Sequence, residues 1–122
     1  MKKQDKKIEE KIIDAEGKTL GRVSTEIASS LIGKTEVSYQ RHVYSGLKVK
    51  VVNASKIKIT PKKLEEISHS RYSGFRGGLR ILKGTETVEK KGFNELIKLA
   101  VDRMLPKNKL KREMMKNLKI EN

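Results

Sequence analysis

Arginines, glycines and aromatic residues are interleaved between Arg71 and Arg80, a segment that we call the arginine loop. Guanidinium groups bind phosphate oxygens, aromatic rings stack on bases or riboses, and glycines let a backbone approach a sugar-phosphate chain closely. A flexible turn with Phe75 in the core would explain the same residues. However, no acid occurs between His69 and Lys83, which favours contact with RNA or DNA. The residues predicted to bind here are Arg71, Tyr72, Ser73, Gly74, Arg76, Gly77, Gly78 and Arg80.

A second cationic segment surrounds Pro106. We call its residues, Arg103–Lys116, the basic corner. Proline lacks an amide hydrogen and disfavours helical geometry at Leu105, so one helix is expected to end there, and Asn108 can cap the next. Seven lysines and arginines but only one acid, Glu113, occur from Arg103 to Lys119. A merely solvated helix face would mix both signs, so this clustering indicates a polyanionic partner. The predicted contacts are Arg103, Lys107, Asn108, Lys109, Lys111, Arg112 and Lys116.

A Gly-Lys-Thr triplet at Gly17–Thr19 resembles the end of a phosphate-binding loop. That mechanism needs another glycine upstream so that consecutive amides wrap a phosphate, and residue 12 is isoleucine. We therefore interpret the triplet as a structural turn with Thr19 at the start of a helix. The alternative, a nucleotide-dependent enzyme, predicts saturable nucleotide binding that Lys18→Ala abolishes.

No constellation of residues typical of catalysis is found in the sequence. The sequence contains no paired carboxylates, no nucleophile motif and no metal-binding cluster. The chain contains no cysteine, and its two isolated histidines, His42 and His69, cannot form a metal site by themselves. The sequence predicts a protein that is not an enzyme and that has no metal, cofactor or small-molecule substrate.

Composition points to one domain with an anionic partner. The 122 residues suit a single domain with a modest core. Twenty-nine Lys and Arg against fifteen Asp and Glu give a net charge of +14, a self-repulsion that a nucleic acid or an anionic membrane surface would offset. Apolar runs fall far short of the roughly 20 residues that span a bilayer, and no secretory cleavage pattern occurs. We expect a cytoplasmic protein without membrane insertion.

Apolar spacing predicts the elements that position these residues. Residues 1–11 are mostly charged and are expected to form a mobile basic extension before a single domain at 12–122. Apolar residues at helical spacing predict helices over Leu20–Leu31, closed by Gly33, and over Phe93–Met104. Alternating or short apolar runs predict strands at Ile12–Ala15, Leu47–Asn53, Ile57–Ile59 and Ser68–Ser73. A helical turn is expected at Lys62–Ile67 and a helix from Asn108, whereas Thr85–Lys91 fits no single pattern.

Strands and helices in alternation predict an α/β layer fold with a mainly parallel sheet. The arginine loop and the basic corner would then lie at two edges of one domain.

Four short segments of the chain carry a family resemblance: DAEGKTLGR at Asp14–Arg22, VVNA at Val51–Ala54, YSGFRGGL at Tyr72–Leu79 and MLPKNKL at Met104–Leu110. In this order and spacing they resemble bacterial large-subunit ribosomal protein thirteen, from about Ile12 to Ile120. The chain departs from the family at Val43–Leu47, where family members commonly carry an aspartate-rich turn.

The resemblance implies a three-layer α/β domain with a four-stranded parallel sheet. In this chain the fourth strand would come from the short segment Leu118–Ile120 and would pair with the first strand. It also implies a structural constituent of the large ribosomal subunit that binds large-subunit ribosomal RNA directly, has neighbouring ribosomal proteins and joins the particle early. The family pattern places RNA contact on the same two segments that the charge pattern indicates. From charge alone, an RNA- or DNA-binding regulator or chaperone outside the ribosome remains the alternative.

Overall fold

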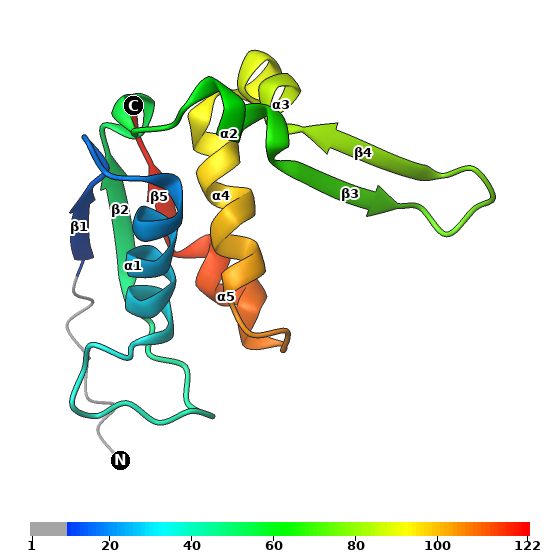
Figure 1. The fold of residues 1–122 in the computed structure, drawn as a ribbon. Helices are drawn as coiled ribbons and strands as arrows, with labels where there is room; N and C mark the ends of the chain where they lie inside the picture. Colours follow the sequence, from blue (N-terminus) through cyan, green and yellow to red (C-terminus); the bar gives the residue numbers. More distant parts are fainter. Residues whose placement is uncertain (1–9) are drawn as a thin grey trace.

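A parallel sheet of three strands lies at the centre of the computed structural model, which describes residues 10–122 (Figure 1). The strands are β1 (Glu10–Asp14), β2 (Lys48–Val52) and β5 (Leu118–Ile120), in the order β1-β2-β5. Their register aligns Ile13 with Val51 and Val51 with Ile120, so these apolar side chains share one face of the sheet. On the opposite face Ile12 is 67% exposed, because the helices cover only the first face.

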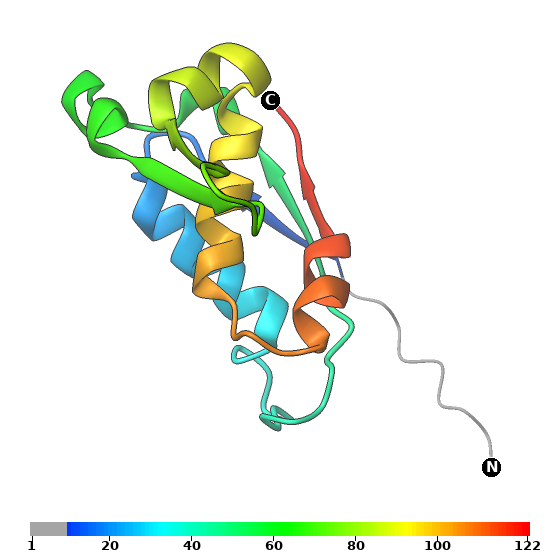
Figure 2. The ribbon, with the colours of Figure 1, turned by 90° about the vertical axis from the view of Figure 1, so that its right-hand side faces the viewer.

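Two helices, α1 (Leu20–Ile32) and α4 (Phe93–Met104), pack side by side on the apolar face of the sheet (Figure 2). Each carries the predicted apolar stripe: Val23, Ile27 and Leu31 are buried on α1, and Leu96, Ile97 and Val101 on α4. A shorter helix, α5 (Leu110–Lys116), adds the buried Met114 to this core. The core therefore holds the position of α4, which the basic corner follows directly.

A hairpin projects from this body, and nearly all of its residues are exposed (Figure 1). It consists of β3 (Ser68–Tyr72) and the antiparallel β4 (Leu79–Lys83), and we call residues 68–83 the arm. At its base lie α2 (Pro61–Glu66) and α3 (Gly84–Lys91), with a hydrogen bond of 2.8 Å from the amide of Gly84 to the carbonyl of Ile67. Of the ten strand residues only His69 is buried.

The structure confirms the α/β single-domain fold with a parallel sheet, and it confirms most of the predicted elements. The helical turn after Pro61 forms, capped by Thr60, whose side chain accepts a hydrogen bond from the amide of Lys63. The segment that fitted no single pattern is helix α3. The strand predicted from Ser68 is β3.

Three details of the predicted sheet are wrong. The described sheet has three strands, not four, and its helices cover one face rather than both, so no third layer is built from residues 10–122. In addition, β5 pairs with β2 and not with β1. This pairing places Leu118 beside Val49 and makes β2, which contains the buried Val49 and Val51, the central strand.

Two boundaries also differ from the predictions. Ile57–Ile59 is not a strand: a 3-10 turn at Ala54–Lys56 precedes it, and a single bridge joins Thr19 to Lys58. The first strand begins at Glu10, so the last two residues of the predicted extension belong to β1. The rest of that prediction falls on residues 1–9, outside the described part of the chain.

Candidate nucleic-acid interface

The register of the arm separates its side chains onto two faces. Arg71 lies opposite Arg80 and His69 opposite Leu82, and directly opposed residues of an antiparallel pair share a face. Arg71 and Leu82 line a pocket with α3 and α4, so this face is turned toward the helices. The opposite face carries the pairs Tyr72–Leu79 and Ser70–Ile81, in which Leu79 is 59% exposed.

Glycines shape the tip of the arm. Gly74 and Gly77 have φ angles of +90° and +70°, a region that other residues rarely adopt. The amide of Gly78 donates a 3.0 Å hydrogen bond to the carbonyl of Phe75 and closes the turn. Because of this turn, Phe75 is 79% exposed and Tyr72 is 68% exposed, and the alternative that placed Phe75 in the core is wrong.

The basic corner has the geometry that its proline predicts. Leu105 adopts an extended conformation, with φ −75° and ψ 146°, and α4 ends at the preceding residue. The side-chain oxygen of Asn108 accepts a hydrogen bond of 3.2 Å from the amide of Lys111, as expected of a helix cap. Leu105 and Met114 are both buried and fix the corner to the core, whereas Met104, also expected in the apolar stripe, is 43% exposed.

The arm and the basic corner lie near different ends of α4. The arm leaves the body nearer the N-terminal end of α4, and the corner follows its C-terminal end (Figure 1). Lys107, Lys109 and Arg112 line a shallow, open depression at the corner together with Asn108 and Lys111. Arg103, at the end of α4, lies close enough to His69 of the arm to affect its protonation. The two cationic segments therefore flank one helix.

Most of the predicted contact cations are available to a partner. Arg71, Arg76, Arg80, Arg103, Lys107, Lys109, Arg112 and Lys116 have no carboxylate within 4.0 Å among the residues that the structure describes. Lys111 is the exception, because its Nζ lies 3.4 Å from a carboxylate oxygen of Asp102 and its side chain is only 21% exposed. We infer that Lys111 helps to hold the corner together more than it binds an external anion.

Lys109→Ala is therefore expected to weaken binding to a polyanion more than Lys111→Ala. Loss of Lys109 removes one free cation, which lowers the salt-dependence slope of binding by about 0.7 to 0.9 unit if that cation contacts a phosphate. Loss of Lys111 also frees the carboxylate of Asp102, but it should change the slope by a smaller amount. Titration of RNA at several salt concentrations measures both variants, and a larger slope change for Lys111→Ala would contradict the assignment.

His69 is a buried polar residue that the sequence did not mark as special. Neither of its ring nitrogens has a hydrogen-bond partner in the described chain. Burial, followed by the positive charges of Arg103 and Arg71, holds the pKa of His69 below its usual value. The folded protein therefore resists protonation of this imidazole.

The pKa of His69 predicts how stability responds to acid. Below about pH 6.5 the histidine becomes protonated in the unfolded chain but resists protonation in the folded one, so the unfolded state binds more protons. The free energy of unfolding should therefore fall as the pH drops through this range, until the folded pKa is reached. Urea denaturation between pH 7.5 and 5.5 measures the slope. His69→Gln should flatten it, and an unchanged slope would contradict the assignment.

The Gly-Lys-Thr triplet is a structural turn. The amides of Gly17 and Lys18 donate hydrogen bonds of 3.2 Å to the carbonyls of Lys56 and Ala15, so they are not free to wrap a phosphate. The Nζ of Lys18 lies 3.0 Å from a carboxylate oxygen of Glu26. Thr19 precedes the first residue of α1, as predicted.

Residues 10–122 contain neither a candidate metal centre nor a membrane-spanning helix. No group of three or more His, Cys, Asp or Glu side chains there is arranged to hold a metal ion. None of the helices in this part of the chain has the length and apolar character needed to cross a membrane.

Sequence reasoning missed strand β4 and the pocket that it helps to form. Apolar and polar residues do not alternate regularly along β4, because neither face of the strand is buried in the core. A usable signal was nevertheless present: β3 is followed by a glycine-rich turn and then by Leu79–Lys83, which is the pattern of a hairpin. Pairing those two strands would have placed Leu82 beside His69.

The fold and the two cationic segments define a small, basic α/β protein with an exposed arm and few acids beside its cations. The family described as Ribosomal protein L13 matches residues 9–120. The large ribosomal subunit protein uL13 of Thermotoga maritima is 47% identical over 109 residues, which cover 89% of this chain and 72% of the relative. Its counterpart in Syntrophotalea carbinolica is 48% identical over 109 residues, covering 89% and 76%. That of Thermosipho africanus is 42% identical over 120 residues, covering 98% and 80%. The chain belongs to the ribosomal protein L13 family.

Proposed function

We propose that this protein binds large-subunit ribosomal RNA directly, through the arm and the basic corner, and that it joins the large subunit early in assembly. The observation that carries the proposal is the arm itself. It presents exposed arginines and two exposed aromatic rings, and it contains no acid. Guanidinium groups for phosphates and rings for unstacked bases are the two components that proteins use to bind folded or single-stranded RNA.

Family membership makes the protein a structural constituent of the ribosome and not an enzyme, as the sequence predicted. The relatives are named as proteins of the large ribosomal subunit, which identifies that subunit in the cytoplasm as the location. Ribosomal RNA and neighbouring ribosomal proteins are then its partners. The net charge of +14, which is costly for an isolated protein, is offset by such an environment.

The mechanism is multivalent neutralisation of phosphates by cations at fixed positions. Each lysine or arginine that contacts a phosphate releases counterions, so affinity falls steeply as salt increases. The basic corner keeps its spacing because Leu105 and Met114 are buried and Asn108 caps α5. Fixed spacing favours a folded RNA whose phosphates fit the cations over an arbitrary polyanion.

Early entry into the subunit follows from the same chemistry. Both cationic segments are suited to RNA, so binding requires no protein to have assembled beforehand. We expect the protein to bind protein-free ribosomal RNA with a strong salt dependence. If it bound only to particles that already contain other ribosomal proteins, early entry would be ruled out.

Sedimentation of cell lysate tests the location of the protein. At magnesium concentrations that preserve ribosomes, the protein should sediment with the large subunit and leave it only in high salt. Recovery in the soluble fractions under the same conditions would contradict the proposal and would favour a nucleic-acid-binding regulator outside the ribosome.

A further inference from the structure

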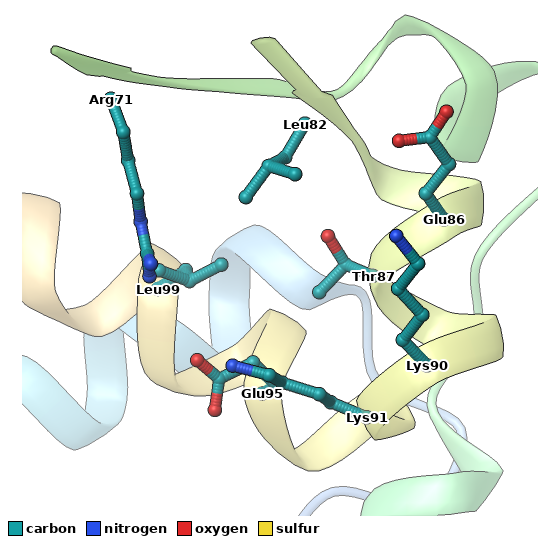
Figure 3. Close-up of a pocket in the computed structure, with 8 residues that line it drawn as sticks. All are labelled: Arg71, Leu82, Glu86, Thr87, Lys90, Lys91, Glu95 and Leu99. Atoms are coloured by element: carbon teal, nitrogen blue, oxygen red, sulfur yellow. The ribbon is translucent and has the colours of Figure 1, made fainter. Parts of the chain in front are cut away.

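A pocket lies between the arm and helices α3 and α4, and Arg71 is the one residue of the cationic segments that lines it (Figure 3). Its volume is about 160 Å³. Several water molecules of roughly 30 Å³ each would be needed to fill it, yet it is smaller than the roughly 300–1,000 Å³ pockets that hold drug-sized ligands. The size suits a single planar ring with its substituents.

The walls of the pocket combine apolar and charged groups. Leu82 and Thr87 point into it from the arm and from α3, and Arg71 reaches across it toward Leu99 of α4 (Figure 3). These side chains offer an apolar surface on one side and a flat guanidinium group on the other. Arginine planes stack on nucleobases, so this pairing suits a flat aromatic ring.

The pocket is also lined by two lysines and two glutamates, and each kind of side chain could bind a different part of a nucleotide. Lys90 and Lys91 can neutralise the phosphates on either side of an inserted nucleotide. Glu86 and Glu95 carry hydrogen-bond acceptors, and neither carboxylate lies within 4.0 Å of a cationic nitrogen in residues 10–122. Carboxylates accept hydrogen bonds from the exocyclic amino groups of bases.

We propose that this pocket receives one unpaired nucleobase with an exocyclic amino group, extruded from the RNA that the arm binds. The inference rests on the proposed function. A base is favoured over a protein side chain because the pocket places an arginine plane, carboxylate acceptors and flanking lysines around the volume of one ring. The arm would thus add recognition of a particular nucleotide to its binding of phosphates.

Chemical probing of the Watson–Crick edges of bases tests the proposal. The probe is ribosomal RNA extracted from large subunits of the source organism, treated with dimethyl sulfate for A and C and with kethoxal for G, with and without the full chain. The wild-type protein should protect one unpaired base. Leu99→Phe, which fills the pocket without changing charge, should leave that base reactive and weaken binding by roughly tenfold.

Two further variants separate occupation of the pocket from misfolding. Glu95→Gln keeps the size of the side chain but removes the carboxylate, so it should weaken the same protection several-fold. Ile12→Phe is the matched control, because it makes a similar change at an exposed position on the open face of the sheet. It should preserve the wild-type pattern.

The possible results distinguish this inference from the function on which it rests. If Leu99→Phe protects the same base as the wild type, the pocket does not hold it, although RNA binding stands. If a photo-crosslinker at position 99 reacts with a protein and not with RNA in assembled large subunits, the nucleobase is also ruled out. If the wild-type chain shows no salt-dependent binding to the RNA, the proposed function fails and this inference fails with it.

Discussion

Replacing Lys107, Lys109 and Arg112 together by alanine is expected to reduce the salt-dependence slope of ribosomal RNA binding by about 2 to 3 units. The three side chains are exposed and line one depression, and they have no carboxylate within 4.0 Å in the described chain. Each phosphate contact that is lost removes somewhat less than one unit from the plot of log affinity against log salt concentration. Filter binding at several potassium chloride concentrations measures the slope.

The control for this experiment removes the same amount of charge elsewhere. Lys34, Lys48 and Lys58 are exposed and lie outside the arm and the basic corner. Their triple alanine variant has the same net charge as the corner variant, so it corrects for a general loss of attraction. Equal slopes for the two variants would show that the basic corner does not contact the phosphates specifically.

Replacing Tyr72 or Phe75 by alanine is expected to weaken RNA binding by roughly 5- to 150-fold without changing the salt slope. Both rings are largely exposed at the tip of the arm, where unstacked bases can pack on them. Stacking of a base on an aromatic ring is worth about 1 to 3 kcal/mol and releases no counterions, which explains why the slope stays constant. Titration of the RNA at two salt concentrations measures both quantities.

A conservative variant and a matched control sharpen the second prediction. Phe75→Tyr keeps the ring and should retain most of the affinity. Tyr39→Ala removes an exposed ring from the loop between α1 and β2 and should have little effect. Full affinity in both Tyr72→Ala and Phe75→Ala would contradict a stacking role for the arm.

The helices were the most predictable part of the fold, because their apolar residues recur at a spacing that only a helix places on one face. Val23, Ile27 and Leu31 identified α1, and they are fully or almost fully buried. Leu96, Ile97 and Val101 identified α4 in the same way, and all three are fully buried. Local chemistry also sufficed at the corner, where Pro106 ended one helix and Asn108 capped the next.

The pairing of β5 could not be predicted from local pattern. Leu118–Ile120 is too short to specify a partner, and both β1 and β2 offer apolar residues. The choice of β2 depends on the path of the chain through α4 and α5, and on the burial gained when Leu118 packs beside Val49. Such long-range packing leaves no periodic trace in the sequence.

The positions of the cationic segments in the candidate interface were predictable, but the contacts that their side chains make within the protein were not. Clustering of cations and the lack of acids identified the arginine loop and the basic corner. The ion pair between Lys111 and Asp102 was not predictable, since it joins residues on either side of the corner and depends on the angle between the two helices. Burial of His69 likewise depends on the pairing of β3 with β4, which places Leu82 opposite it.

Mapping of RNA–protein crosslinks in purified large ribosomal subunits tests the direct RNA contact most directly. Ultraviolet irradiation followed by mass spectrometry identifies the peptides that carry nucleotide adducts. We predict adducts within Arg71–Arg80 and within Arg103–Lys116. Adducts confined to the open face of the sheet, around Ile12, Lys50 and Lys119, with none in the arm or the basic corner, would contradict the account.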